Sequence, residues 1–310
     1  MSYLETLTLR LAAGAMRLTD DLRRRHAAFL NNAQNDDGGF SGREGPSDLY
    51  YTAFALRGLA LTGELSEDVA ARTDRYLQER LPGKMPSIDF LSLVSCAVLL
   101  EATSGIDVFA AAGRDRKTMV IETLEPFRRD DGGYAKTDRS PHSSTYHTFL
   151  AAASKQLVGA ADADEAPRNV ALIRSRKRDD GGFVELPQIA QSGTNPTAAA
   201  IGLLRLLDAM DRPTRDHAAA FLAEMQNAEG GLRANGRIPL ADLLSTFTGL
   251  VALADLDALS TIDLTAARRY VEALQQPDGG FRGAVWDDAA DVEYTFYGLG
   301  TLALLVSLDS

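Results

Sequence analysis

The residues best suited to chemistry in this sequence are tyrosines, a histidine and a glutamate that stand just before recurring threonines. The two positions before such a threonine read Tyr50-Tyr51, Tyr146-His147 and Glu293-Tyr294. Further aromatic residues follow within a turn, among them Phe247, Phe296 and Tyr297. Aromatic faces suit a long apolar ligand and can stabilise a carbocation. We therefore predict an aromatic-lined cavity with His147 and Glu293 as its titratable members; aromatic filling of the interior is the alternative.

These residues recur because the chain is repetitive. Five variants of one motif occur, QNDDGGF, RRDDGGY, KRDDGGF, QNAEGGL and QQPDGGF. The first glycines of the last four motifs, Gly132, Gly181, Gly230 and Gly279, are 49 residues apart, and 94 residues separate Gly38 from Gly132. A degenerate copy is therefore expected near residue 85, at Arg80-Leu81-Pro82-Gly83-Lys84. Six repeats then account for residues 1–310 as a single domain without a linker.

Each repeat predicts two helices around the Gly-Gly turn. The first helix is amphipathic and begins after a cap such as Ser66, Thr214 or Asp263. Paired glycines close it in the left-handed conformation, and the acidic residue before them can bond backbone amides. The second helix is apolar nearly all round, which is typical of a helix buried on every side. The predicted apolar helices are Leu49–Leu61, Phe90–Leu100, Tyr146–Ala153, Ala198–Leu207, Leu243–Leu253 and Tyr294–Leu305.

This alternation predicts an all-α fold of the α/α toroid type. Six helical hairpins would form an inner and an outer ring of about twelve helices. An open solenoid is the alternative, but its ends would need polar capping repeats. Because the last repeat is a full apolar copy, the sequence favours the closed arrangement.

Two further positions recur in the repeat frame. Near the start of the apolar helices stand Asp48, Asp89, Ser144, Gly193, Asp242 and Asp291. A carboxylate there serves as N-cap and interacts favourably with the helix dipole. Four residues later, except in the second repeat, stand Thr52, Thr148, Thr197, Thr246 and Thr295, for which we predict a packing role between helices.

Composition excludes several classes of function. The 310 residues are 45% hydrophobic and 24% charged, which is typical of a globular protein. The net charge of −11 argues against nucleic acid or an anionic membrane as the main partner. A single cysteine, Cys96, excludes an internal disulfide and a cysteine-rich zinc cluster. No apolar run approaches a membrane span and no basic amphipathic helix predicts a stable anchor, so we expect a cytoplasmic protein.

The Q-x-x-D-G-G-F repeat in six helical hairpins resembles the prenyltransferase/squalene-cyclase repeat over essentially the whole chain. A single barrel of this length is similar to the β subunit of protein prenyltransferases of the Rab geranylgeranyltransferase type. The resemblance implies an isoprenoid diphosphate or another long apolar ligand, and the transfer of isoprenoid groups as the activity. It also implies a helical α-subunit-like partner, with a homo-oligomer as the alternative.

The resemblance implies a zinc site that this sequence does not keep. The family binds zinc through an Asp and a Cys at the start of the fifth inner helix and a His in the sixth. The matching positions here are Asp242, Leu244 and Tyr294. Leucine and tyrosine cannot replace thiolate and imidazole as zinc ligands. We therefore predict no cofactor and a zinc-independent or diverged protein.

The resemblance also implies basic residues that hold the diphosphate. Arg233 and Arg237 stand in the corresponding loop, GGLRANGR, and Arg237 is the better match. Guanidinium groups bind diphosphate oxygens bidentately. Transfer would then rely on electrostatic stabilisation of the leaving group, with Tyr294 or His147 orienting the acceptor. The tunnel for the prenyl chain would be lined by Tyr50, Tyr51, Tyr146, Phe247, Phe296 and Tyr297.

Two alternatives stay open. Class II terpene and triterpene cyclases carry a D-x-D-D-T motif whose middle Asp is the general acid, and Asp291-Val292-Glu293-Tyr294-Thr295 resembles it with Glu in the middle. Burial beside another carboxylate can keep such an acid protonated, although Asp291 and Glu293 would not share a face of a regular helix. The other alternative is a toroidal binding or scaffold protein without catalysis.

Overall fold

The computed structural model describes residues 1–81, 83–110, 113 and 115–308. Within them the chain forms thirteen α-helices, two 3₁₀ helices and one short antiparallel ladder, in which Phe281 pairs with Asp291. The helices are α1 (Tyr3–Ala15), α2 (Asp20–Asn32), α3 (Leu49–Thr62), α4 (Glu67–Arg80), α5 (Ser87–Ser104), α6 (Arg116–Leu124), η2 (Glu125–Phe127), α7 (Thr145–Leu157), α8 (Ala166–Ser175), α9 (Thr194–Leu206), α10 (Arg212–Glu224), α11 (Leu243–Asp255), η3 (Leu259–Thr261), α12 (Leu264–Ala273) and α13 (Val292–Val306), and the strands are β1 (Phe281–Arg282) and β2 (Ala290–Asp291).

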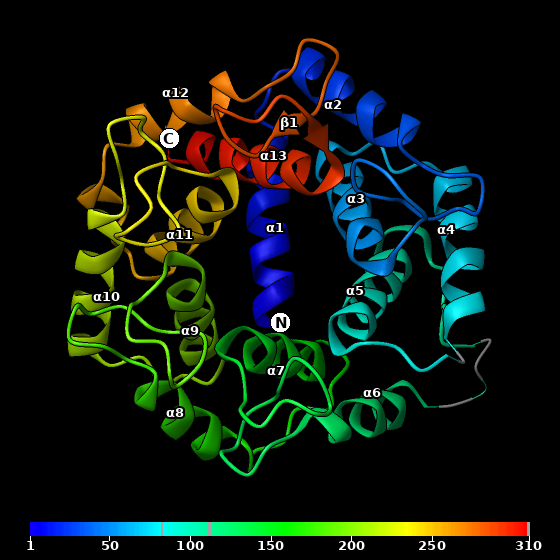
Figure 1. Ribbon diagram of the computed structural model, residues 1–310. Coiled ribbons are helices and arrows are strands. Elements are labelled where there is room, and N and C mark those ends of the chain that lie inside the picture. The colour runs from blue at the N-terminus through cyan, green and yellow to red at the C-terminus, as the bar shows by residue number, and fades with distance from the viewer. Residues whose placement is uncertain (82, 111–112, 114, 309–310) are drawn as a thin grey trace. The chain divides into compact units, whose positions relative to one another are not determined.

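The chain divides into two compact units. Unit 1 comprises Met1–Glu5 and Leu124–Ala273, and unit 2 comprises Thr6–Thr123 and Leu274–Ser310. In unit 2, α3 packs against both α5 and α13; in unit 1, α9 packs against both α7 and α11 (Figure 1). We call these six the core helices. The prediction of a single domain over residues 1–310 stays a prediction.

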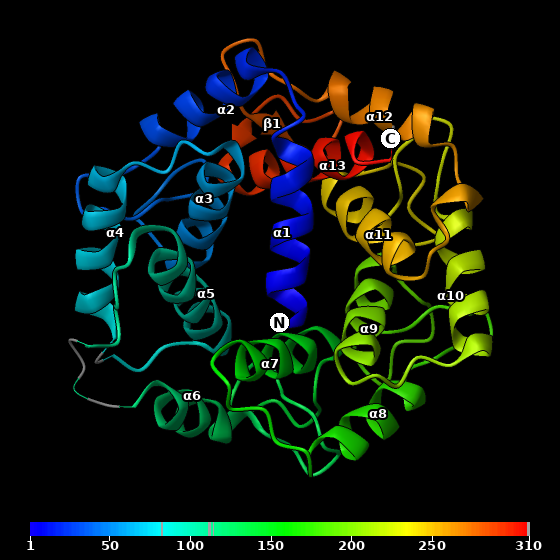
Figure 2. The same ribbon diagram turned by 180° about the vertical axis from the view of Figure 1, so that it is seen from behind.

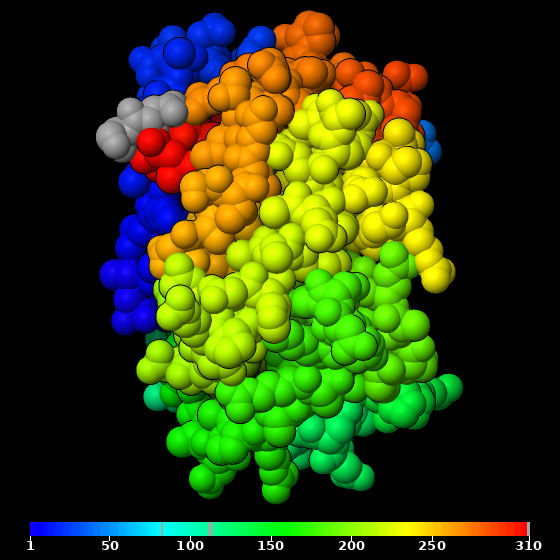
Figure 3. Space-filling view, turned by 90° about the vertical axis from the view of Figure 1, so that its left-hand side faces the viewer, coloured from blue at the N-terminus to red at the C-terminus, as the bar shows by residue number. Residues whose placement is uncertain are grey.

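Amphipathic helices cover the core helices. In unit 2, α2 packs on α3 and α4 packs on α5; in unit 1, α8 packs on α9 and α10 packs on α11 (Figure 2). Helices α10 and α12 lie at the surface of unit 1 (Figure 3). On α10, for example, Arg212 and Asp216 form an ion pair at 3.6 Å with side chains 91% and 59% exposed. The alternation of amphipathic and apolar helices predicted from the sequence is confirmed.

Each of the six predicted hairpins consists of two helices in chain order, and the second of them is a core helix. All six apolar segments form core helices, with ends that differ from the prediction by up to four residues. Helix α1 lies outside this scheme, so the prediction that six repeats account for the whole chain was wrong for the first fifteen residues. Within unit 2 the end of α1 packs closely on α13, since a Cβ on Gly14 would lie 2.1 Å from the Ala303 carbonyl oxygen.

The Gly-Gly motifs form the predicted turns. The first glycine of each motif has a positive φ, between 88° and 97°, which only glycine adopts readily. Asp37, Asp131 and Asp180 accept hydrogen bonds from the amide of the second glycine at 3.0 to 3.2 Å. The large apolar residue that follows is at most 2% exposed in all five motifs. In the predicted sixth copy, Arg80–Lys84, Pro82 lies outside the described residues.

Each motif also packs against the next covering helix. A Cβ on Gly132 would lie 2.6 Å from the Arg168 Cβ in α8, and one on Gly181 would lie 2.6 Å from the His217 carbonyl oxygen in α10. The last motif, QQPDGGF, packs on α2 in the same way, because a Cβ on Gly279 would lie 2.6 Å from the Arg25 carbonyl oxygen. Within unit 2, the last motif is therefore a neighbour of the first covering helix.

The recurring threonines do more than pack. Each is fully buried, and its Oγ1 accepts the backbone N–H of the large apolar residue after the Gly-Gly pair, at 2.8 to 3.1 Å. In four of the five repeats the same hydroxyl donates to the N-cap carbonyl four residues earlier; the exception is Thr197. The prediction of a packing role alone was incomplete, because a buried amide needs an acceptor.

This bond makes Thr197 a test of the repeat. We expect Thr197→Val to lower the free energy of unfolding by about 1–3 kcal/mol, because the Phe183 N–H loses its acceptor while the side-chain volume is kept. Thr197→Ser keeps the hydroxyl and should cost less. Urea unfolding of the two variants measures the difference, and equal stabilities would contradict the role given to the hydroxyl.

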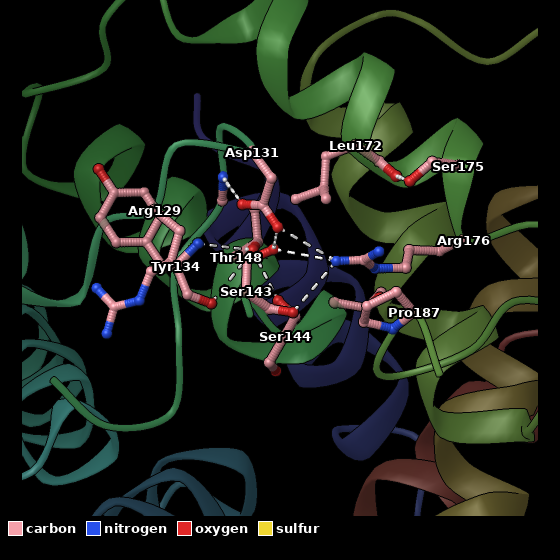
Figure 4. Close-up of polar contacts among 12 residues, drawn as sticks. Arg129, Asp131, Tyr134, Ser143, Ser144, Thr148, Leu172, Ser175, Arg176 and Pro187 are labelled. Atoms are coloured by element: carbon pink, nitrogen blue, oxygen red, sulfur yellow. Dashed lines mark hydrogen bonds and ion pairs between the residues drawn. The ribbon is translucent and has the colours of Figure 1, made fainter. Parts of the chain in front are cut away.

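Further polar contacts connect the RRDDGGY motif of the third repeat to the hairpin that follows it. The Arg176 Nη2 donates to the Asp131 Oδ2 at 3.4 Å and to the Ser143 carbonyl at 3.3 Å, and Ser143 Oγ donates to Asp131 Oδ2 at 2.7 Å (Figure 4). Arg176 is only 4% exposed. The carboxylate of the motif therefore holds a buried guanidinium and has a structural role in this repeat.

The N-cap predictions hold for most repeats. Asp48, Ser144, Asp242 and Asp291 each accept the backbone N–H three residues later, at 2.7 to 3.0 Å. The prediction was wrong for Asp89, which lies inside the first turn of α5 because that helix begins at Ser87. Among the covering helices Ser66 caps α4 as predicted, whereas α10 is capped by Asp211 and not by Thr214.

Helix α5 departs from one sequence expectation. Its 18 residues have a mean hydropathy of 1.4, so by length and composition it could cross a membrane. A buried core helix of a soluble protein can have the same length and hydropathy. Half of it is buried inside the protein, against α3 and α4. Cys96 on this helix is 1% exposed, as predicted for a core residue, and burial raises the pKa of its thiol to about 12.

Candidate functional site

The first turns of α3 and α13 bring a carboxyl group and several aromatic rings together in unit 2. Asp48 and Asp291 cap the two helices, which fixes where their first turns begin. Tyr50 and Glu293 are the second residues of these helices, and the Tyr50 hydroxyl donates to Glu293 Oε1 at 2.6 Å. We call the set Tyr50, Phe54, Glu293, Phe296 and Tyr297 the Glu293 cluster.

The ring of Phe54 contacts the other three rings of the Glu293 cluster. Phe54 lies 4.9 Å from Tyr50, 5.6 Å from Phe296 and 5.1 Å from Tyr297 between ring centroids. Phe54, Phe296 and Tyr297 are 4 to 6% exposed, while Tyr50 and Glu293 are partly exposed. Glu293 therefore lies at the partly exposed edge of a buried aromatic cluster.

Glu293 is placed to hold a proton. Its Oε1 accepts from the hydroxyls of Tyr50 and Tyr297, at 2.6 and 3.2 Å, and its Oε2 has no hydrogen-bond partner among the described residues. Burial raises its pKa above the ordinary value. The charge of Asp291 acts in the same direction, and the two tyrosine hydroxyls and the charge of Arg57 oppose it. In the protonated form of this carboxyl group the proton lies on Oε2, because Oε1 accepts the two hydroxyls.

Asp291 has a different environment although it is two residues away. Its Oδ1 accepts the Tyr294 N–H at 2.9 Å, and its Oδ2 lies 3.3 Å from Arg43 Nε. Burial raises its pKa, and the backbone bond and Arg43 oppose this. Arg43 is held in turn by Asp287. Asp291 and Glu293 bond to different groups, and Asp291 serves as cap and ion-pair partner.

Tyr51 and Tyr294 lie beside the Glu293 cluster in unit 2. The Tyr51 ring contacts Tyr50 at 5.4 Å, and the Tyr294 ring lies 6.4 Å from Tyr297. Each packs on a glycine backbone, Gly42 and Gly283 respectively, where a Cβ would lie 2.6 to 2.7 Å from the ring. Of the predicted site residues, the structure thus brings the following together in unit 2: Tyr50, Tyr51, Asp291, Glu293, Tyr294, Phe296 and Tyr297.

His147 belongs to a second polar cluster, in unit 1. Its Nδ1 lies 2.9 Å from Ser144 Oγ, which also hydrogen-bonds to Glu185 Oε1. The Nε2 atom is buried and has no hydrogen-bond partner among the described residues. Because the serine donates its one proton to the carboxylate, we assign the imidazole proton to Nδ1, and Nε2 carries the lone pair. Burial lowers the pKa of His147 to about 4, so the ring is neutral at pH 7.

This assignment predicts a pH effect on stability. The pKa of His147 in the folded protein, about 4, is below its ordinary value of 6.5, so the unfolded chain binds the proton first. The stabilising contribution is complete above pH 6.5 and is lost as the pH falls through about 4, by about 2–3 kcal/mol. His147→Gln should show a smaller loss over this range. An NMR titration checks it directly, and a His147 ring signal that titrates near 6.5 would contradict the prediction.

The other predicted residues of unit 1 lie outside this cluster or at its edge. The Tyr146 ring lies 5.6 Å from that of His147, and its N–H donates to Glu185 Oε2 at 3.3 Å. Phe247 on α11 is 7% exposed. Arg233 donates from Nη2 to the Glu224 carbonyl at 2.7 Å, whereas the side chain of Arg237 is exposed and has no hydrogen-bond partner among the described residues. Their diphosphate-binding role stays a prediction.

The residues at the family's zinc positions do not fit a zinc ion. Asp242 Oδ1 accepts the Ser245 N–H at 2.7 Å and Oδ2 accepts the Ser245 hydroxyl at 2.8 Å, so the carboxylate serves as a cap. Leu244 and Tyr294 supply neither thiolate nor imidazole. Among the described residues, no group of three or more His, Cys, Asp or Glu side chains could hold a metal ion.

The family of the chain follows from its sequence as a whole. Residues 14–79, 71–237 and 204–310 match the model of the prenyltransferase alpha-alpha toroid domain. The chain belongs to this family. The predicted fold class, an all-α α/α toroid, and the predicted resemblance are confirmed by this match.

Solved structures with the same toroid fold carry different chemistries. Protein geranylgeranyltransferase-I of Candida albicans, complexed with GGPP, matches with a TM-score of 0.72 and 16% identity over 91% of both chains. A variant of the type II terpene cyclase MstE from Scytonema, in complex with the substrate geranylgeranyl dihydroxybenzoate, matches with a TM-score of 0.62 and 14% identity. The match covers 98% of this chain and 99% of the cyclase chain. An α-1,6-mannanase of Salegentibacter sp. HEL1_6, in complex with α-1,6-mannotriose, matches with a TM-score of 0.65 and 13% identity. The match covers 93% of this chain and 99% of the mannanase chain.

At these identities the similarity shows the fold of the toroid domain alone. No curated protein matches the sequence. Because one fold supports transferases, cyclases and glycosidases, the function has to be argued from the site.

Sequence reasoning missed three residues of these sites. Arg43 and Glu185 lie in loops whose side chains carry no repeat signal. Arg57 lies on α3 with its guanidinium over the rings of Phe54 and Phe296, at 4.7 and 5.1 Å. A signal for Arg57 did exist in the sequence, because it is the sole charged residue of an otherwise apolar helix.

Proposed function

We propose that this toroid protein binds an isoprenoid compound on the Glu293 cluster and starts its chemistry by protonating a carbon–carbon double bond of the ligand from Glu293. The observation that carries the proposal is the bonding of Glu293, a partly exposed residue whose Oε1 accepts two tyrosine hydroxyls while Oε2 has no hydrogen-bond partner among the described residues. The match to a terpene cyclase and to a geranylgeranyltransferase supports an isoprenoid as the ligand class.

The proposed step balances as an acid-catalysed addition. The O–H bond at Glu293 Oε2 breaks, and the π electrons of the double bond form the new C–H bond. A carbocation remains at the other carbon, where the rings of Tyr50 and Tyr297 stabilise it. Ring closure by a second double bond and loss of a proton to water end the reaction, and solvent reprotonates the Glu293 carboxylate. The product has the same mass as the substrate.

Incubation in D₂O tests this proposal. The purified protein is mixed separately with geranylgeraniol, geranylgeranyl diphosphate and geranylgeranoic acid, and products are analysed by mass spectrometry. We expect an isomer that contains one deuterium on a new C–H bond, because the proton donor exchanges with solvent. If all three compounds are recovered unchanged although one of them binds, the proton-transfer proposal is wrong.

Transfer of a prenyl group is a second candidate function. The exposed Arg237 guanidinium, which has no hydrogen-bond partner among the described residues, favours it, because the resemblance assigns the diphosphate to its loop. The similar geranylgeranyltransferase structure in complex with GGPP supports the same ligand class. Release of inorganic diphosphate from geranylgeranyl diphosphate, lost in Arg237→Ala and retained in Glu293→Gln, would favour transfer over protonation. An α-subunit-like partner and a cytoplasmic location remain predictions.

A further inference from the structure

Arg57 is an unusual residue for a core helix. It is the only charged residue of α3, and it lies mid-helix, one turn after Phe54. Its Nε donates to the Ala53 carbonyl at 3.1 Å, which fixes the start of the guanidinium. The guanidinium then lies over the rings of Phe54 and Phe296, at 4.7 and 5.1 Å from their centroids.

The two Nη groups of Arg57 have no hydrogen-bond partner and no ion-pair partner among the described residues. The side chain is only partly exposed. Taking a guanidinium away from water is costly unless an anion or hydrogen-bond acceptors compensate. The aromatic faces compensate in part, but they leave the N–H donors at the edge of the group unused.

Lys155 shows how the same protein treats a cation that is purely structural. This lysine lies on the core helix α7 in unit 1 and is 5% exposed. Its Nζ lies 2.8 Å from Glu165 Oε1 and 2.7 Å from the Tyr134 hydroxyl. The structural cation has a buried carboxylate at hydrogen-bond distance, whereas no carboxylate of the described residues lies at that distance from Arg57.

We propose that Arg57 binds an acidic group, a carboxylate or a phosphate, of the isoprenoid ligand. The proposal rests on the proposed function and specifies its substrate class: a prenyl compound with an anionic group. Planar guanidinium donors bind both kinds of anion in a bidentate manner. Neither the sequence motifs nor the family positions discussed above include this residue.

The position of Arg57 relative to Glu293 limits the distance between the acidic group of the ligand and its reacting double bond. Tyr50, which hydrogen-bonds to Glu293, and Arg57 are seven residues apart on one face of α3, so they are separated by roughly 10 Å along the helix. The acidic group therefore lies within about two helical turns of the double bond that meets Glu293. This requires a short or folded prenyl chain.

An anion on Arg57 would also assist the proton transfer. The positive charge of Arg57 lowers the pKa of Glu293, and it would repel a carbocation that forms beside the rings of the Glu293 cluster. A bound carboxylate or phosphate neutralises that charge. Ligands without an acidic group leave the guanidinium uncompensated and are expected to bind and react less well.

Three ligands with the same prenyl chain test the proposal: geranylgeranoic acid, geranylgeranyl diphosphate and the neutral geranylgeraniol. Affinities are measured by isothermal titration calorimetry with the full chain. We expect at least one of the two anions to bind about 10- to 100-fold more tightly than the alcohol. Whichever anion shows the preference identifies the source as carboxylate or phosphate.

Variants assign the preference to Arg57. Arg57→Gln should remove it and leave the affinity for the alcohol within about threefold, whereas Arg57→Lys should retain part of it, because lysine keeps the charge and loses the planar fork. Arg24→Gln, which changes an exposed arginine of α2 in the same unit, is the matched control and should retain the preference. Should Arg57→Gln fail to fold, the Lys variant still has to show the reduced preference.

The outcomes separate this inference from the proposed function. Equal affinity of wild type for all three ligands, or a preference that survives in both Arg57 variants, overturns the role of Arg57 and leaves isoprenoid binding in place. If none of the three ligands binds, both proposals are overturned.

Discussion

Replacing Glu293 by glutamine is expected to lower the turnover of the isoprenoid substrate by about 10²- to 10⁴-fold while substrate affinity stays nearly unchanged. The amide has the shape of the carboxylic acid, and its oxygen can still accept from the hydroxyls of Tyr50 and Tyr297. What it lacks is the proton on Oε2. Product formation in D₂O, measured as deuterated isomer per minute at saturating substrate, gives the ratio of wild-type to variant turnover.

Two controls make the Glu293 result specific. Glu64→Gln changes an exposed carboxylate of unit 2 after the end of α3 and should have wild-type turnover. In the wild type, turnover should fall as the pH rises through the raised pKa of Glu293, because the protonated form is the active one. A Glu293→Gln variant that turns over at the wild-type rate would leave the cluster as a binding surface only.

A second large effect is expected for the repeat motif itself. Phe183→Ala should lower the free energy of unfolding by about 3–5 kcal/mol, because the ring is fully buried and its removal leaves a cavity in the core of unit 1. Chemical denaturation monitored by circular dichroism measures the change.

Phe183→Leu is the matched variant, since Leu232 occupies the same place in the next motif and is also fully buried. Both residues donate their backbone N–H to a repeat threonine, Thr197 or Thr246, so the local frame is kept. We expect the leucine variant to lose well under half of what the alanine variant loses. Equal losses would show that the backbone turn, and not the side chain, supplies the stability of the motif.

Much of the fold could be predicted because its signals are local. The paired glycines need a left-handed turn, and the apolar stretches between them read as buried helices; both depend on residues a few positions apart. For the same reason the N-caps Asp48, Asp242 and Asp291 were predicted correctly. The N-cap prediction was wrong for Asp89 because the second repeat has lost the Gly-Gly motif that sets the register in the other repeats.

The candidate site was predicted only in part. The aromatic residues and Glu293 were predicted from their place before and after the repeat threonines. The sequence favoured prenyl transfer with Arg233 and Arg237, yet Arg233 directs its guanidinium to the carbonyl groups at the end of α10. Which turn a side chain bonds to is decided by the loop conformation, and repeat spacing does not report it.

The sequence alone determined the family, the repeat register, the helices and the loss of the family's zinc ligands, because these follow from residue types and short-range spacing. Only the tertiary structure decided which groups surround Glu293. Tyr50 and Glu293 are 243 residues apart in the chain, and Arg57 meets Phe296 across the same pair of helices. Such contacts depend on how α3 and α13 pack side by side, and the protonation of a carboxyl group depends on what that packing places around it.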